Sequence, residues 1–99
     1  MTTTAQATKT QTATDAAAII ETARMLAERP GWNVPLLAVY EMFDWSIERF
    51  HAALRALDGT VAWLEPEPQL RRLTEMDHLV KIHTSGAEWE YKHTIVVAD

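Results

Sequence analysis

The residues whose expected positions come closest to a metal site in this 99-residue chain are His78 and His93. If the two segments that carry them pair as the strands of a hairpin, their imidazole rings face each other across it. Only two imidazoles then converge and no carboxylate is placed beside them, whereas a protein zinc site uses three or four ligands. We therefore expect a packing role for this pair, and we predict no metal and no other cofactor.

Residue arrangements typical of enzymes are missing from the sequence. The chain contains no cysteine, which removes disulfides, Cys-ligated zinc and thiol nucleophiles together. It also has no Gly-rich phosphate loop, no Ser-His-Asp spacing of a catalytic triad and no pair of carboxylates with an obvious cleft. We predict that the protein is not an enzyme. The lack of cysteine fits a reducing compartment, so the cytoplasm is the expected location.

The composition indicates one soluble domain with an excess of acidic residues. Hydrophobic residues make up 47% of the chain and charged residues 23%, which is typical of a globular protein. No apolar run approaches the length needed to span a bilayer, so we expect no membrane partner. Nine Lys and Arg against fourteen Asp and Glu give a net charge of −5, which opposes indiscriminate attraction to phosphate or anionic lipid. Any contact with nucleic acid must therefore be local.

The sequence divides into a tail and a domain. Residues 1–14 contain no aromatic side chain and, after Met1, no aliphatic one larger than alanine, so burial cannot offset the entropy lost on ordering. We predict a disordered tail over 1–14 and a folded domain over 15–99. Asp15 can cap a first helix whose apolar residues recur at helical spacing, and the Arg-Pro-Gly sequence at 29–31 ends it.

Two more helices are expected to follow. Asn33 can cap the second, with Pro35 inside its first turn, and Ser46 is a natural cap for the third, over 46–57. Gly59 then supplies a left-handed exit. The inward faces repeat at i, i+3, i+4 and i+7, and they consist of Leu36, Val39, Tyr40 and Phe43 in the second helix and Phe50, Ala53, Leu54 and Leu57 in the third.

The short link between the second and third helices determines how they pack. Two residues separate Phe43 from Ser46, so the helices must cross at a steep angle. We expect Trp45, the apolar residue of this link, to be a buried plug between them. Trp32 and Trp89 are also expected inside, because tryptophan in a small domain is more often part of the core than of an interface.

After Gly59 the apolar period becomes two. Residues 60–65 alternate as a short strand, which ends at the prolines that follow. A hairpin with its turn at Ser85 and Gly86 then brings apolar residues together on one side and opposite charges on the other. The expected cross-strand pairs are Ile82 with Trp89, Val80 with Tyr91, His78 with His93, Lys81 with Glu90 and His83 with Glu88.

The pattern of residues 36–65, LLAVYEMFDWSIERFHAALRALDGTVAWLE, resembles the winged helix-turn-helix family. The second and third expected helices correspond to the two helices of the motif, with Trp45 at the apolar turn position and Ser46 at the cap. Asp44 departs from the family, because glycine is usual in that turn. The resemblance implies an α+β fold, a winged helix-turn-helix with three helices followed by a short strand and a C-terminal β-hairpin.

The resemblance further implies a sequence-specific DNA-binding regulator whose third helix, 46–57, lies in the major groove. In that family the outward face of this helix reads bases and its N-terminus can hold a phosphate. The implied DNA contacts are Ser46, Arg49, His51 and Arg55 on the helix, with Arg71 and Arg72 reaching flanking phosphates. One short helix buries too little for tight specific binding, so we expect a homodimer on double-stranded DNA.

A second interpretation keeps the fold but replaces DNA by a protein partner. The net charge of −5 supports it. Glu48, on the outward face of the third helix, counts against the DNA contact, because a carboxylate is repelled by phosphates; it favours reading the charges of this face as ordinary solvated side chains. Leu37, Met42 and Ile47 are expected on the outside, where they can form a partner surface. Fold alone does not choose between the two functions, whereas the salt dependence of binding to duplex DNA does.

Overall fold

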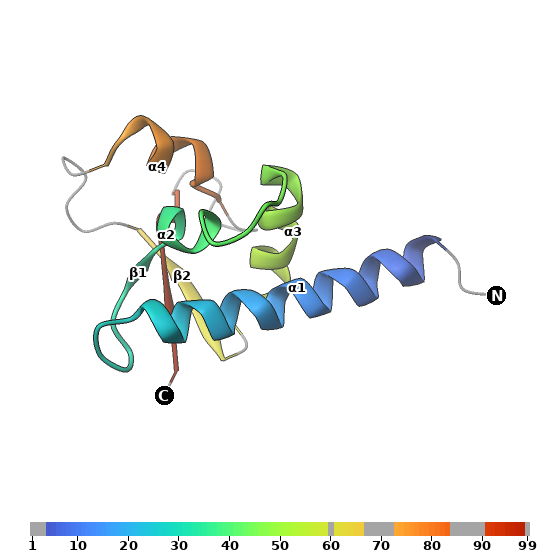
Figure 1. Ribbon diagram of the computed structural model, residues 1–99, viewed down its shortest axis with the longest axis horizontal. Helices are drawn as coiled ribbons and strands as arrows, with labels where there is room; N and C mark the ends of the chain where they lie inside the picture. Colours follow the sequence, from blue (N-terminus) through green and yellow to red (C-terminus); the bar gives the residue numbers. More distant parts are fainter. Residues whose placement is uncertain (1–3, 60, 67–72, 84–90, 99) are drawn as a thin grey trace.

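The computed structural model of the chain describes residues 4–59, 61–66, 73–83 and 91–98, which form an α+β domain (Figure 1). The helices of this part are α1 (Thr4–Leu26), α2 (Leu36–Tyr40), α3 (Ile47–Leu57) and α4 (Glu75–Val80), and its strands are β1 (Val34–Pro35), β2 (Ala62–Glu65) and β3 (Thr94–Val97). The strands form one antiparallel sheet. The α+β prediction is therefore confirmed.

The sheet has its last strand in the centre, in the order β1-β3-β2. Ile95 of β3 lies opposite Val34 on one side and opposite Leu64 on the other, and all three side chains are buried. Because successive side chains of a strand point to opposite faces, this register directs one face of the sheet toward the core. β3, at the C-terminal end of the chain, thus lies between β1 and β2 and pairs with both.

The outer edge of β2 is covered by the turn that precedes it. The Leu64 N–H donates to Asp58 Oδ1 at 3.0 Å, and the Gly59 N–H donates to the Ala62 carbonyl oxygen at 2.9 Å. An open strand edge invites pairing with another chain. Here one N–H and one carbonyl oxygen of the edge are already bonded within the chain, which makes β2 a poorer template for a further strand.

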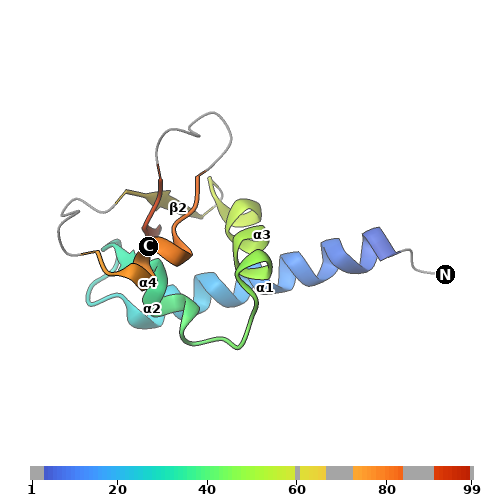
Figure 2. The ribbon, with the colours of Figure 1, turned by 90° about the horizontal axis from the view of Figure 1, so that it is seen from above.

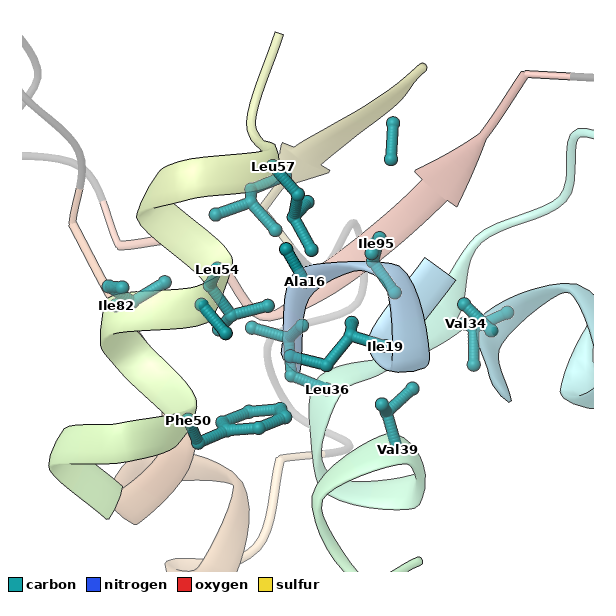
Figure 3. Close-up of a cluster of buried hydrophobic side chains, with 14 of the residues drawn as sticks. Ala16, Ile19, Val34, Leu36, Val39, Phe50, Leu54, Leu57, Ile82 and Ile95 are labelled. Carbon is teal, nitrogen blue, oxygen red and sulfur yellow. The ribbon is translucent and has the colours of Figure 1, made fainter. Parts of the chain in front are cut away.

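The hydrophobic core lies between α1, α2, α3 and the inner face of the sheet, where the labelled side chains converge (Figure 3). The four inward positions predicted for α3, namely Phe50, Ala53, Leu54 and Leu57, are all buried. Leu36 and Val39 of α2 are buried too, and the rings of Tyr40 and Phe50 meet edge to face with centroids 5.0 Å apart. The periodicity of the sequence therefore identified all four inward positions of α3 and two of the four predicted for α2, whereas Tyr40 and Phe43 are partly buried and Phe43 follows the helix.

The start of α1 differs from the expectation. The helix begins at Thr4, so residues 4–14 are helical rather than a disordered tail, and this part extends past α3 (Figure 2). Asp15 lies inside the helix, and its predicted role as N-cap is wrong. The stretch has no Gly or Pro, so nothing in it stops a helix that propagates toward the N-terminus from the packed half.

The start of α2 also needs correction. Its N-cap position is Pro35, which makes no side-chain cap bond, and Asn33 does not cap the helix. The side-chain amide of Asn33 instead donates to Thr94 Oγ1 of β3 at 3.0 Å and to Glu65 Oε2 of β2 at 3.1 Å. The reason is the pairing of Val34 and Pro35 with β3, which draws this segment into an extended conformation before the helix begins.

The third helix begins and ends as predicted. Ser46 is its N-cap, with the hydroxyl oxygen accepting from the Arg49 N–H at 3.2 Å, and Gly59 follows it with a positive φ of 84°. Trp45 is not the expected plug. Its half-buried ring stacks on Phe43 with centroids 4.1 Å apart, and Trp32 is exposed rather than inside.

The predicted hairpin strand over 78–83 is wrong, because residues 75–80 form α4. Thr74 and Asp77 make a capping box in which each side chain accepts from the other residue's backbone N–H, at 3.2 and 2.9 Å. This local signal outweighs the alternating pattern. Ile82 pairs with Lys92 instead of Trp89. Ser85, Gly86, Glu88, Trp89 and Glu90 lie outside the described residues, so the turn, the expected pairs of Lys81 and His83 and the burial of Trp89 stay predictions.

Candidate functional site

The outward side of α3 was the predicted nucleic-acid interface, and Arg49 is its central residue. The guanidinium of Arg49 donates to both carboxylate oxygens of Asp15, from Nε to Oδ2 at 2.8 Å and from Nη2 to Oδ1 at 3.0 Å. Its Cζ also lies 4.4 Å from the centroid of the Trp45 ring. The hydrogen bond to Asp15 raises the pKa of Arg49. The Nε and Nη2 donors of Arg49 are therefore not free to bind a base or a phosphate through two parallel hydrogen bonds.

The location of Asp15 explains this pairing. α1 packs along α3, and the Asp15 side chain is 5% exposed, on the side of α1 that faces α3. A buried carboxylate needs a cation with good geometry, and the planar guanidinium supplies two parallel hydrogen bonds. Arg49 thus joins the two helices, which the sequence did not predict because the two residues are 34 positions apart.

His51 points toward α4 rather than outward. Its Nε2 lies 3.0 Å from the carbonyl oxygen of Val80, the last residue of α4. Since a carbonyl oxygen only accepts, the ring donates through Nε2. The half-buried imidazole holds the C-terminal end of α4 against α3, and it is not part of an exposed contact surface.

The exposed strip of α3 consists of Glu48, Ala52, Arg55 and Ala56. These positions are spaced at i, i+4, i+7 and i+8, so they lie on one side of the helix. Asp44 is exposed just before the N-cap. The strip and Asp44 together present two carboxylates and one guanidinium, and this net negative charge disfavours binding to the DNA backbone.

Of the other predicted DNA contacts, Ser46 is the one that lies within the described residues. The Ser46 hydroxyl is the helix cap, and Arg71 and Arg72 lie outside the described residues. Of the alternative partner residues, Leu37 and Ile47 are half-buried and pack against the core, whereas the Met42 side chain is 57% exposed. The three residues therefore do not form an exposed apolar patch together.

A hollow at the opposite end of the domain was not found by sequence reasoning. It has a volume of about 170 Å³ and lies between the end of α1, the loop that follows and the end of β3. The residues that line it are Ala23, Arg24, Ala27, Glu28, Arg29, Pro30, Gly31, Trp32, Val34, Val97 and Ala98. The sequence signal that could have pointed to it is the Arg-Pro-Gly-Trp run, in which a turn exposes an aromatic ring next to a cation.

The two histidines considered as metal ligands do approach each other. The rings of His78 on α4 and His93 before β3 lie edge to face with centroids 6.4 Å apart. Their proximity comes from the packing of α4 near the entry to β3 and not from the predicted hairpin. Across the residues that the structure describes, no three His, Cys, Asp or Glu side chains are grouped so as to hold a metal ion.

Comparisons with known proteins do not assign this surface to a family. No protein-family model matches the chain, and neither a curated protein nor a solved structure matches it. In the described part of the chain, no helix has the length and apolar character needed to cross a membrane.

Proposed function

We propose that the chain is a winged-helix domain that binds a protein partner rather than DNA. The winged-helix assignment is supported by the order of elements, since three helices precede an antiparallel pair, β2 and β3, and the segment between those strands stands where the wing does. The preceding α3 is capped by Ser46 and buries one face, as the second helix of the motif does. The long connection between β2 and β3 includes α4, which is an addition to the simple motif.

The choice of a protein partner rests on the ion pair between Arg49 and Asp15. DNA recognition through α3 needs cations that face outward, and this guanidinium is bound by the buried Asp15. Releasing it would leave an uncompensated carboxylate in the core, which is costly. Arg55 is then the cation left on the exposed strip, beside Glu48 and near Asp44. Each like charge that faces a phosphate weakens association, so a protein surface is the better ligand.

The test is a chemical-shift titration of the full-length protein with random-sequence duplex DNA at about 50 mM and about 200 mM salt. We expect the amide signals of residues 47–55 to stay unmoved at both. The Glu48→Lys variant serves as the positive control, because it converts the strip to a net cation and should shift the same signals at the lower salt. Glu21→Lys makes the same charge change on exposed α1 and should not. Salt-sensitive shifts of residues 47–55 in the wild-type protein would overturn the proposal in favour of DNA.

A further inference from the structure

The hollow beside the end of α1 has an apolar floor. Ala23, Val34 and Val97 line it and belong to the buried core, with exposures of 0%, 3% and 7%. Its volume of about 170 Å³ is close to that of an apolar protein cavity that holds a benzene molecule. The space therefore suits one phenyl-sized group, and a longer chain of atoms must lie outside it.

The rim of the hollow is aromatic and cationic. The Trp32 side chain is 49% exposed, and the Cζ of Arg29 lies 5.2 Å from the centroid of its ring. Arg24, on the last turn of α1, is the second cation of the lining, and Glu28 is its acidic residue. In a chain of net charge −5, this is a locally cationic place.

Both rim arginines differ from Arg49 in having no carboxylate partner within the part of the chain that the structure describes. Among the described residues, neither Arg24 nor Arg29 forms an ion pair, although both are exposed and Glu28 is a near neighbour in sequence. A guanidinium is well suited to bind a carboxylate through two parallel hydrogen bonds, and tryptophan and arginine are the residues most enriched among energetically important interface positions.

We propose that this hollow is the docking site for an acidic segment of a partner protein, which inserts one phenyl side chain and places flanking carboxylates on Arg24 and Arg29. The inference rests on the proposed protein-binding function and names its surface. A protein segment fits better than a small molecule because the exposed Trp32 and the two cations lie around the opening, where the flanking residues of a chain pass.

The experiment titrates the isotope-labelled full-length protein with three peptides that differ in one feature each. The first is Glu-Asp-Phe-Asp-Glu, the second has Ala in place of Phe, and the third has Lys in place of all four acids. We expect the first peptide to shift the amides of Ala23, Ala27 and Val34 and the indole N–H of Trp32. Loss of the phenyl group or reversal of the flanking charge should weaken binding by about tenfold each.

Protein variants test the same contacts from the other side. Arg24→Gln and Arg29→Gln should each weaken binding of the first peptide by about threefold to tenfold, because each removes a charge-assisted pair. Arg55→Gln removes the same charge from α3 and should leave binding unchanged. Ala27→Leu should block the hollow. If that variant does not fold, the two glutamine variants still decide the outcome.

Three results would overturn this inference. The first is no shift at the hollow at about 5 mM of the first peptide, a concentration at which even millimolar binding is seen. The second is an equal response to the Phe and Ala peptides. The third is a concentration-dependent shift of the same signals without peptide, which would make a second copy of the chain the occupant. If neither the peptide nor the DNA shifts any amide signal, the docking site at the hollow is rejected and the proposed function is not. If DNA shifts the amide signals of α3, the proposed function itself is rejected.

Discussion

Helices α3 and α4 begin with the same kind of cap but are held by very different amounts of burial. Ser46 caps α3 and Thr74 caps α4, each accepting a backbone N–H of the first turn. α3 then buries four apolar side chains, whereas α4 buries Val80 at its end. The cap sets where a helix starts, and burial sets how much the helix adds to the free energy of unfolding.

The largest expected effect is at the buried face of α3. Phe50→Ala should lower the free energy of unfolding by about 4 kcal/mol, because it removes a fully buried ring and leaves a cavity against Tyr40. Chemical denaturation followed by circular dichroism measures the loss. Arg55→Ala, on the exposed side of the same helix, should change it by less than about 0.5 kcal/mol. Equal losses in the two variants would contradict the assignment of faces.

The contrast between α3 and α4 also shows what could be read from the sequence. The inward positions of α3 follow from a period that only a helix satisfies, and its cap and glycine exit agree with that period. The segment 74–83 carries two conflicting local signals, a capping box and an alternating apolar pattern. The short α4 follows the capping box and not the alternating pattern. Val80 and Ile82 are nevertheless both buried, although Val80 ends the helix and Ile82 forms an isolated bridge with Lys92.

The parts that could not be predicted depend on contacts between distant residues. Asp15 and Arg49 are 34 positions apart, and nothing in their local sequence indicates that they pair. The central position of β3 likewise depends on pairing with β1 and β2 from far along the chain. The partners of Arg49 and His51 could not be predicted for the same reason, because whether a polar side chain is free is decided by its tertiary contacts and not by its place on a helical wheel.

An intermediate effect is expected at the entry to α3. Trp45→Ala should cost about 2 kcal/mol, less than the full value for a buried tryptophan, because the ring is half-buried between Phe43 and Arg49. Thermal or denaturant unfolding measures it. Trp45→Phe keeps an aromatic ring for the stack and should recover about half of the loss. A cost above that of Phe50→Ala would restore the view of Trp45 as a buried plug.

A smaller and local effect is expected for α4. Thr74→Ala removes the hydroxyl of the capping box and should cost about 1 kcal/mol, and hydrogen exchange should show faster opening of the amides of residues 75–80 while those of α3 are unchanged. Thr74→Ser keeps the hydroxyl and is the matched control. If the exchange of α3 accelerated equally, α4 would belong to the same cooperative unit and the contrast between the two helices would be lost.

The smallest effect is expected at the beginning of α1. Residues 4–10 extend past α3 (Figure 1), and this stretch is rich in threonine, which is a weak helix former. An isolated helix of that length is marginal in water, so deleting residues 1–10 should change the free energy of unfolding by less than about 0.5 kcal/mol. Circular dichroism should report the helical signal that the deleted residues contribute, and denaturation the unchanged midpoint. Ala23→Gly, at a fully buried position of the same helix, should cost about 1 kcal/mol or more. A deletion that destabilised the domain more than this substitution would mean that the first turns of α1 are docked, and that burial, as in α3, is what holds them.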